Sequence, residues 1–482
     1  MKFKITSFDE FRASGGRRPV VAEIPCDFET PVTLFSRWQR EKHAFLLESV
    51  EGGEKWGRYS FIGLFPSLIF KSRGDKVELI ERGKSRVVKN KDPLGLLRQL
   101  LSKQPVLDPK MRFAGGAVGF VSYDAVRLFE KISVHSKDEG KFPDFCFIFP
   151  SLVLVLDNLK QSLQILWIPR SGEVSRSEYR RGKRLIERVV RPLGSGTRGM
   201  VREKKPKGPM RWKTSFSENL FCKKVSRIKE YILAGDVTQT VLSLRFETAG
   251  RRDPLQVYRG LRQLNPSPYL FYLKMGETVI VGASPETMVH LEGSQAVLRP
   301  IAGTRRRGIS EEEDQRLERE LLADPKERAE HVMLVDLGRN DLGRVAKKGT
   351  VVVDQLMTIE RYSHVMHIVS NVRAELPEGR DAFDLLRATF PAGTLTGSPK
   401  IRAMEIIEEI EERRRGVYGG CVGYFSSNGN MDMAITIRSA VFHGGKIYVQ
   451  AGAGIVADSE PKKEYQECLN KAKGMMMAVE GL

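Results

Sequence analysis

The stretch Gln450-Ala-Gly-Ala-Gly-Ile-Val-Ala-Asp-Ser-Glu-Pro461, near the end of the chain, carries two glycines on either side of one small residue, Ala453. Gly452 and Gly454 have no side chain, so we expect a glycine turn whose backbone N–H groups a ligand can approach closely. The residues Asp458-Ser-Glu-Pro461 then predict the start of a helix, with the proline in its first turn.

The helix that begins there carries three charged residues at helical spacing. Glu464, Glu467 and Lys471 stand at i, i+3 and i+7, which places them on one helical face. Two carboxylates and an ammonium beside a glycine turn can hold a metal ion and an acidic small molecule. The same spacing is also typical of a solvated helix face, so this stretch alone leaves both interpretations open.

A second acidic pair lies in Asp324-Pro-Lys-Glu-Arg-Ala-Glu-His331. Asp324 can cap a helix, Pro325 fits the first helical position, and Glu327 can close a capping box. Glu330 follows one turn later, directly before an apolar run at 332–335. Two acidic helical turns tied to buried elements can supply the oxygen ligands that Mg²⁺ prefers, so we expect a magnesium site.

Composition limits the class of protein. The chain has 482 residues, of which 41% are hydrophobic and 29% charged, as expected for a globular protein of two or three domains. No apolar run is long enough to span a membrane, and the N-terminus lacks the apolar core of a signal peptide. The five cysteines (Cys26, Cys146, Cys222, Cys421 and Cys468) are scattered without zinc-binding spacing. We therefore expect a cytoplasmic protein with no zinc site.

The formal net charge of +19 makes a basic nucleic-acid-binding protein one hypothesis. The Lys and Arg residues are, however, spread along the chain and mixed with 60 acidic residues. Mixed charge of this kind is typical of solvated faces or ion-pair networks. A positive field would also attract an acidic substrate.

The pattern of strands and helices indicates an α+β fold with two interleaved regions. Residues 1–193 form an N-terminal region, 194–213 a polar linker rich in Gly and Pro, and 214–482 the region that holds the chemistry. Short strands are predicted at 44–49, 59–63, 67–71, 77–80, 151–157 and 162–168, and strands dominate 239–299. Helices are predicted at 96–101, 217–235, 310–322, 325–337, 382–389 and 399–412, and a basic helix up to about 190. Hairpins are predicted to turn at 428–429 and 444–445.

The order of motifs resembles the chorismate-utilising enzymes, and within them the anthranilate synthase large-subunit (component I) group. The resemblance covers nearly the whole chain, and its motifs in chain order are specific only as a set. They are Leu46-Leu-Glu-Ser49, Asn265-Pro-Ser-Pro-Tyr-Leu270, Ala283-Ser-Pro-Glu286, Pro300-Ile-Ala-Gly-Thr304, Glu330-His-Val-Met-Leu-Val-Asp-Leu-Gly-Arg-Asn-Asp341, Val365-Met-His367, Gly393-Thr-Leu-Thr-Gly-Ser-Pro-Lys400 and the glycine–glutamate stretch above.

The resemblance implies a fold of β-sandwich-like antiparallel sheets flanked by helices. It also implies that Glu330 and Glu467 bind Mg²⁺, that Glu327 and Glu464 support the ion through water, and that the ion holds the ring carboxylate of chorismate. Substrate-binding residues by resemblance are Gly303, Thr304, Tyr418, Arg438, Gly452, Ala453, Gly454 and Lys471. Catalytic residues by resemblance are Glu286 as general acid, His367 at an unassigned step, and Thr394 to orient ammonia or the ring.

Two positions discriminate among relatives. Isochorismate and salicylate synthases carry a water-activating lysine where this chain has Gln239, so ammonia is the expected nucleophile. Aminodeoxychorismate synthases usually carry a lysine nucleophile where this chain has Ala302, which cannot form a covalent intermediate. An enzyme that stops at aminodeoxyisochorismate remains an alternative. Arg306, where proline is common in the family, is expected to change only a loop.

The resemblance also implies partners and regulation. The sequence has no recognisable glutaminase, so ammonia should come from a separate glutamine amidotransferase subunit in a hetero-oligomer. Ser49, Pro268, Tyr269 and Leu270 correspond to the family's inhibitor site for L-tryptophan. A Ser hydroxyl can bond the polar end of an amino acid, and a Pro-Tyr surface can pack an indole.

Overall fold

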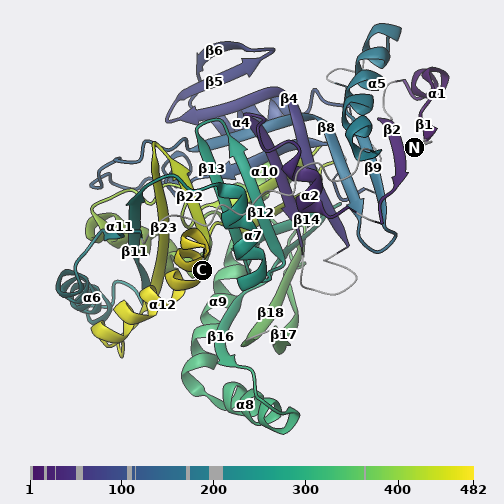
Figure 1. Cartoon of the computed structure of the whole chain (residues 1–482). Coiled ribbons are helices and arrows are strands. Elements are labelled where there is room, and N and C mark those ends of the chain that lie inside the picture. Colours follow the sequence, from purple (N-terminus) through teal and green to yellow (C-terminus); the bar gives the residue numbers. More distant parts are fainter. Residues whose placement is uncertain are drawn as a thin grey trace.

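The computed structural model describes residues 4–15, 19–27, 29–49, 58–105, 111–113, 115–169, 174–194, 210–362 and 365–481. Its chain mixes helices with runs of consecutive strands such as β12 (Tyr269–Met275) to β16 (Ile301–Arg306) (Figure 1). The α-helices are α1 (Phe8–Ala13), α2 (Pro31–Ser36), α4 (Pro93–Leu101), α5 (Arg176–Val190), α6 (Glu218–Leu233), α7 (Pro254–Leu264), α8 (Glu311–Ala323), α9 (Pro325–Gly343), α10 (Ala382–Thr389), α11 (Lys400–Glu411) and α12 (Pro461–Glu480).

Antiparallel pairing connects all the strands into one network with two arms. The first arm runs in the order β1 (Lys4–Ile5), β2 (Val20–Pro25), β9 (Ser162–Trp167), β8 (Phe145–Asp157), β4 (Tyr59–Arg73), β3 (His43–Glu48), β12 (Tyr269–Met275), β13 (Thr278–Ser284), β22 (Ser439–His443), β23 (Lys446–Ile455) and β11 (Gln239–Ala249), with β10 (Lys213–Thr214) and β19 (Gly397–Ser398) at its end. The second arm runs from β6 (Lys84–Lys89) and β5 (Lys76–Glu81) through β4 and β8 to β7 (Gly116–Val121), β20 (Cys421–Ser426), β21 (Met431–Ile435), β14 (Thr287–Glu292), β15 (Gln295–Leu298) and β18 (Val365–Glu375), which β16 (Ile301–Arg306) and β17 (Val352–Arg361) flank.

The long strands β4 and β8 belong to both arms. The first part of β4 pairs with β3 and its second part with β5. The part of β8 that lies beside the first part of β4 pairs with β9, and the part beside the second pairs with β7. The exchange coincides with a register shift between Pro66 and Leu68 and with a positive φ of 52° at Phe65. Such a bulge bends a strand and increases its twist, so it lets one strand pass from one sheet into the other.

Aromatic and aliphatic side chains from both arms meet in a shared interior. Phe45, Phe61 and Phe120 of the N-terminal strands pack there with Phe271 and Tyr424 of later strands. A second large core lies beneath α5, α6, α7, α11 and α12, and a third beneath α4, α9 and α10. The protein is therefore α+β, with antiparallel sheets packed face to face and helices on the outside.

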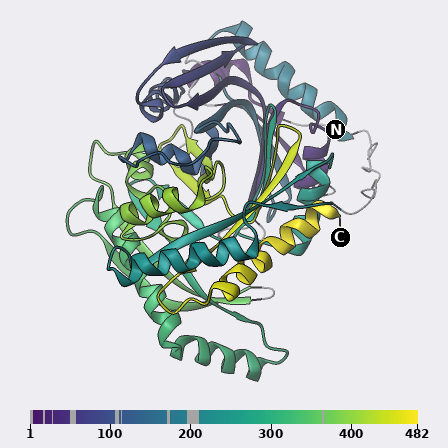
Figure 2. The same ribbon diagram turned by 90° about the vertical axis from the view of Figure 1, so that its left-hand side faces the viewer.

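Figure 2 shows α6 and α12 side by side on the outer face. Their contact includes an edge-to-face pair of Phe221 and Tyr465 with ring centroids 5.4 Å apart. At the lower end of the molecule in Figure 1, β16 leads into α8, which projects from the body.

Most predicted elements are confirmed within a few residues, with two corrections. The predicted strands at 59–63 and 67–71 are parts of the single strand β4, because the Phe65 bulge interrupts the pattern without ending the strand. Helix α7 lies in a region predicted as strands; Asp253 caps it and Pro254 occupies its first turn.

Most of the predicted linker, residues 195–209, lies outside the described residues. The division at 193 and 214 stays a prediction, and strand pairing crosses it at β3–β12 and at β7–β20. Among the described residues, no helix is long and apolar enough to cross a membrane.

Candidate active site

A large, open cavity lies where α9 and α12 approach the ends of β11, β16, β18 and β23. It encloses about 1860 Å³ of space that protein atoms do not fill, counted out to its mouth. The predicted residues that line it are Glu286, Gly303, Thr304, Glu327, Glu330, His367, Thr394, Tyr418, Arg438, Gly452, Gly454, Glu464, Glu467 and Lys471. One predicted member, Ala453, does not line the cavity, because its side chain is buried in the core on the other side of β23.

The glycine motif forms a strand, which corrects the predicted turn. Gly452 and Gly454 lie in β23 and pair with Ser243 and Val241 of β11. A Cβ atom on Gly452 would lie 2.9 Å from the Tyr418 hydroxyl, and one on Gly454 only 2.3 Å from the Gln239 amide nitrogen. The glycines are therefore needed because two polar side chains of the cavity occupy the space beside the strand.

Four carboxylates come from two helices. Glu327 and Glu330 lie one turn apart on α9, and Glu464 and Glu467 one turn apart on α12. Burial raises the pKa of Glu330, a bond from Gln239 opposes that shift, and the charges of Glu327 and Glu467 add to it. Burial likewise raises the pKa of Glu464, with a contribution from Glu467. The carboxylates repel one another, so a cation between them would stabilise their ionised forms.

The start of α9 agrees with the predicted cap but not with the predicted capping box. The Asp324 carboxylate accepts from the N–H groups of Lys326 and Glu327. The Asp324 N–H donates to the Leu321 carbonyl, and the Glu327 carboxylate accepts instead from Arg305 at 3.0 Å. Glu327 is thus held toward the cavity by an arginine that follows the Pro300–Thr304 motif.

The donor set fits Mg²⁺ as a two-carboxylate site. Within the described residues, no three His, Cys, Asp or Glu side chains already stand together as a metal cluster. Lys471 lies 2.5 Å from Glu467, and Gln239 lies 3.3 Å from Glu330, so each predicted ligand already has a polar neighbour. Oxygen ligands from few carboxylates, completed by water, suit Mg²⁺ because it retains several waters when it binds protein.

The cationic side of the cavity is formed by Arg438 and Lys471. Arg438 has φ = 48°, its backbone carbonyl accepts from the Ala283 N–H, and its guanidinium donates to the Lys471 carbonyl at 2.7 Å. Lys471 in turn donates to the Gly452 carbonyl at 3.0 Å. Burial lowers the pKa of Arg438 because it disfavours the charged guanidinium. A carboxylate bound there would compensate this cost by pairing with the charge.

Glu286 is buried in the bend between β13 and β14. Its N–H donates to the Ser284 hydroxyl, and its carbonyl accepts from the Ile435 N–H. Burial raises the pKa of its side chain to about 8, and Thr394 and Lys471 oppose that shift. At neutral pH this carboxyl is therefore mostly protonated and can act as an acid.

His367 on β18 has one ring nitrogen engaged. Its Nδ1 lies 3.1 Å from the Gly303 carbonyl, which can only accept, so Nδ1 carries the proton in that bond. The Thr304 hydroxyl lies 3.0 Å from the same nitrogen. Burial lowers the pKa of His367, so the ring is neutral at physiological pH and Nε2 is unprotonated.

Two contributors were missed from the sequence. Gln450 lines the cavity, and Arg305 bonds both Asp324 and Glu327. Gln450, Gly452 and Gly454 are every second residue along the chain. Interpreting that stretch as a strand would have placed Gln450 on the same face.

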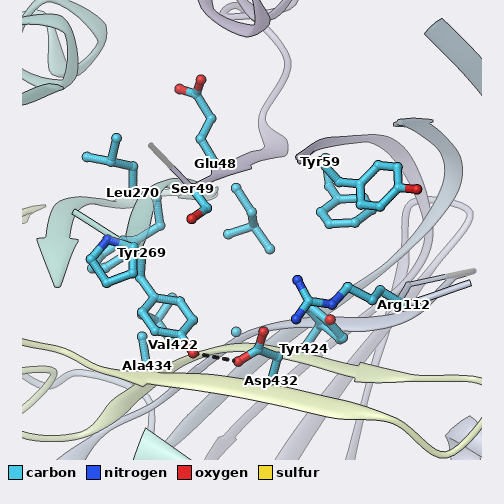
Figure 3. A pocket seen from close by; sticks show the side chains of 15 residues that line it. Glu48, Ser49, Tyr59, Arg112, Tyr269, Leu270, Val422, Tyr424, Asp432 and Ala434 are labelled. Carbon is cyan, nitrogen blue, oxygen red and sulfur yellow. Dashed lines mark hydrogen bonds between the residues drawn. The ribbon is translucent and has the colours of Figure 1, made fainter. Parts of the chain in front are cut away.

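The second predicted site is a separate cavity that encloses about 600 Å³, counted out to its mouth (Figure 3). Ser49, Pro268, Tyr269 and Leu270 all line it, as predicted. The sequence did not predict its other wall, which comes mainly from β20 and β21 and includes Val422, Gly423, Tyr424, Asp432 and Ala434.

Three charged side chains, those of Glu48, Arg112 and Asp432, line this second cavity among mainly aromatic and aliphatic neighbours. The Tyr269 hydroxyl donates to the Asp432 carboxylate at 2.9 Å and lies 3.0 Å from the Thr287 hydroxyl. The Glu48 carboxylate turns away from Ser49 and accepts from Tyr258 of α7. An amino acid with a large apolar side chain would meet mostly aromatic and aliphatic walls here.

Comparison with known proteins agrees with this geometry. The sequence pattern of the family described as "chorismate binding enzyme" matches residues 43–477. Anthranilate synthase component 1 from Aquifex aeolicus is 50% identical over 468 residues, which cover 96% of this chain and 94% of the relative. The protein of the same name from Acetivibrio thermocellus is 46% identical over 470 residues, which cover 96% and 95%. The crystal structure of anthranilate synthase component I from Streptococcus pneumoniae TIGR4 superposes with a TM-score of 0.79 at 35% identity, covering 94% of this chain and 98% of that one.

Proposed function

This chain belongs to the family of chorismate binding enzymes, and from that membership we propose that it acts as component 1 of an anthranilate synthase. It converts chorismate and ammonia to anthranilate, pyruvate and water. The observation that carries the proposal is a single cavity with paired carboxylates on α9 and α12, a buried arginine and a carboxylic acid whose pKa is about 8. The paired carboxylates can hold a cation for one carboxylate of a dianionic substrate, and the arginine can bind the other carboxylate. The carboxylic acid can protonate the hydroxyl group that leaves.

Binding of the substrate divides between the two sides of the cavity. Arg438 and Tyr418 hold the enolpyruvyl carboxylate, and Gly452 leaves room for the Tyr418 hydroxyl beside β23. Glu330 and Glu467 hold Mg²⁺, with Glu327 and Glu464 supporting it through water. When bound, the ion offsets the charge of the ring carboxylate.

The first chemical step adds ammonia at ring carbon 2 as the hydroxyl leaves carbon 4. Protonated Glu286 donates to the departing oxygen, which leaves as water. Thr394 is close enough to Glu286 to act on its pKa, so it can orient the ring or ammonia. Elimination of pyruvate then requires loss of the ring proton at carbon 2, and the unprotonated Nε2 of His367 can accept it.

Ammonia is proposed as the nucleophile because no lysine stands at the two discriminating positions. Gln239 lines the cavity with a neutral amide that donates to Glu330. Ala302 also lines it and cannot form a covalent adduct. These two positions favour anthranilate over isochorismate or aminodeoxychorismate, and the similarity to anthranilate synthases favours it over aminodeoxyisochorismate.

The nitrogen source is proposed to be a partner glutamine amidotransferase in a hetero-oligomer. The relatives are named component 1, which implies a second component. Cys421 is buried in β20, and burial raises the pKa of its thiol, as expected for a structural thiol and not for a glutaminase nucleophile. The five thiols are free, in accord with the proposed cytoplasmic location.

The second cavity is proposed to bind L-tryptophan as a feedback inhibitor. Ser49 would bond the polar end of the amino acid, and Pro268 and Tyr269 would pack its indole ring. The Tyr269 hydroxyl meets Thr287, which directly follows Glu286. Occupancy of the second cavity can therefore act on the proposed acid over a short path.

The test is to incubate the purified chain with chorismate, Mg²⁺ and ammonium at mildly alkaline pH and to identify the product. Anthranilate should form from ammonium, and none from glutamine until the partner subunit is added. Recovery of isochorismate or aminodeoxychorismate as the main product would overturn the proposal. A salt-sensitive gel shift without any turnover would favour the nucleic-acid-binding alternative.

A further inference from the structure

Arg415 is a buried arginine behind the wall of the catalytic cavity. It lies shortly after α11 with only 3% of its surface exposed. Its guanidinium donates to the Leu395 carbonyl at 2.6 Å and to the Val241 carbonyl at 2.9 Å. Leu395 and Val241 both line the cavity. Leu395 directly follows Thr394, and Val241 of β11 pairs with Gly454 of β23. One side chain thus joins two separate wall segments through their backbones.

The same guanidinium also reaches a third wall segment. Its central carbon lies 4.6 Å from the Tyr123 ring centroid and 5.9 Å from that of Tyr418. These distances allow a cation–π attraction in the buried interior of the protein. The Tyr418 hydroxyl is the group that leaves no room for a side chain at position 452.

A buried carboxylate fixes the orientation of the guanidinium. Glu411, one turn earlier, accepts from Nε of Arg415 at 2.9 Å and from one terminal nitrogen at 2.7 Å. Glu411 also accepts from the Ser243 N–H and hydroxyl, each at 2.8 Å. The Ser243 hydroxyl in turn accepts from the side chain of Gln450, which lines the cavity. Although burial acts to lower the pKa of Arg415, Glu411 raises it, so the guanidinium stays charged.

A buried ion pair of this kind is costly compared with apolar residues of equal volume, so stability alone does not explain it. The planar fork of arginine can satisfy two carbonyls and a carboxylate at fixed angles, which a lysine ammonium cannot do. We propose that Arg415 is a positioning residue for the chorismate site, holding Leu395, Val241 and Tyr418 in the arrangement that receives the substrate. This proposal rests on the proposed function.

The test compares Arg415→Lys with the wild-type chain. The variant keeps the charge and loses the fork, so we expect the KM for chorismate to rise about tenfold as the wall loosens. The Mg²⁺ concentration for half-maximal activity should stay within about twofold, because the hydrogen bonds of Arg415 go to Glu411, Leu395 and Val241, none of which lies on α9 or α12. Ser243→Ala breaks only the link from Glu411 to Gln450, and it should raise the KM about threefold in a chain that folds normally.

Arg127→Lys is the matched control. Arg127 is partly buried, with 14% of its side chain exposed, and pairs with two carboxylates, Asp124 and Glu408, neither of which lines the cavity. A purely structural role predicts that both lysine variants lower the thermal midpoint and the active fraction and leave the KM of the folded enzyme unchanged. An unchanged KM in both Arg415→Lys and Ser243→Ala would overturn the proposal. If Arg415→Lys does not fold, Ser243→Ala decides alone. Absence of anthranilate from the wild-type chain would instead overturn the proposed function.

Discussion

The two cavities adjoin one hairpin, because β12 lines the second cavity and Glu286, just after its partner β13, lines the catalytic cavity, yet they differ in chemistry. The catalytic cavity is lined by carboxylates, a buried arginine and a neutral imidazole, and burial perturbs the pKa values of several of these groups. The second cavity is lined mainly by aromatic and aliphatic side chains, and its Asp432 already accepts a bond from Tyr269. The first is therefore built to handle charge and protons, and the second to recognise shape.

The difference predicts which substitutions affect turnover and which affect only regulation. Removing a charge from the catalytic cavity should reduce the rate, because its groups act on the reacting molecule. Filling or altering the second cavity should leave the uninhibited rate almost unchanged. The predictions below test this division from the largest expected effect to the smallest.

The largest effect is expected for Glu330→Gln or Glu467→Gln. Each removes a charged ligand from the proposed Mg²⁺ site, and the rate should fall about 1000-fold because several kcal/mol of charge stabilisation is lost. The fold should remain intact, as measured by circular dichroism. Glu320→Gln, on the projecting helix α8, is the control and should retain full activity. Near-normal activity of either ligand variant at limiting Mg²⁺ would show that the assignment is wrong.

A smaller loss of kcat, about 100-fold, is expected for Glu286→Gln, because glutamine cannot donate the proton to the departing hydroxyl group. The pH dependence is more informative than the loss. Because the pKa of Glu286 is raised to about 8, the active acid form is present below that pH and is lost above it. At a constant concentration of free ammonia, kcat of the wild-type chain should fall about tenfold per pH unit on the alkaline side. Glu286→Gln should lack this limb, and a limb of the same shape in the variant would exclude Glu286 as the acid.

The sequence predicted the carboxylates more reliably than the backbone that surrounds them. Glu327, Glu330, Glu464 and Glu467 lie on the helical turns that the spacing predicts, because helical spacing is a local property, and the Asp324 cap and Pro461 in the first turn mark where each helix begins. The glycine motif was taken for a turn because glycine is typical of turns. Only the positions of Tyr418 and Gln239 show that two glycines are needed inside a strand.

Long-range pairing explains most of what was missed. The second wall of the second cavity, with Val422 and Asp432, comes from strands about 150 residues away from Tyr269 in the sequence. No periodicity within one segment predicts which distant strand will face it. The network around Arg415 was missed for the same reason, because Val241, Leu395 and Arg415 meet only in the folded chain.

The second cavity is tested by Ser49→Phe. The new ring should fill space that an indole ring would need, so the tryptophan concentration for half-maximal inhibition should rise at least about tenfold. The uninhibited rate should stay within about twofold, because Ser49 does not line the catalytic cavity. Inhibition and rate are measured on the same preparation. A variant that stays fully sensitive to tryptophan would mean that the inhibitor site lies elsewhere.

The smallest effect is expected where a side chain of the second cavity contacts the sequence neighbour of Glu286. The Tyr269 hydroxyl faces the second cavity and lies 3.0 Å from the hydroxyl of Thr287, the neighbour of Glu286. Thr287→Val keeps the shape and removes that contact, while Tyr269 keeps its bond to Asp432. Loss of one such bond is worth about 1 kcal/mol, so the factor by which tryptophan and chorismate weaken each other's binding should fall about threefold to fivefold. Binding of tryptophan without chorismate should hardly change. Because coupling is reciprocal, both ligands must report the same reduction in equilibrium titrations. If the coupling factor keeps its wild-type value, the signal between the cavities does not pass through this hydroxyl pair.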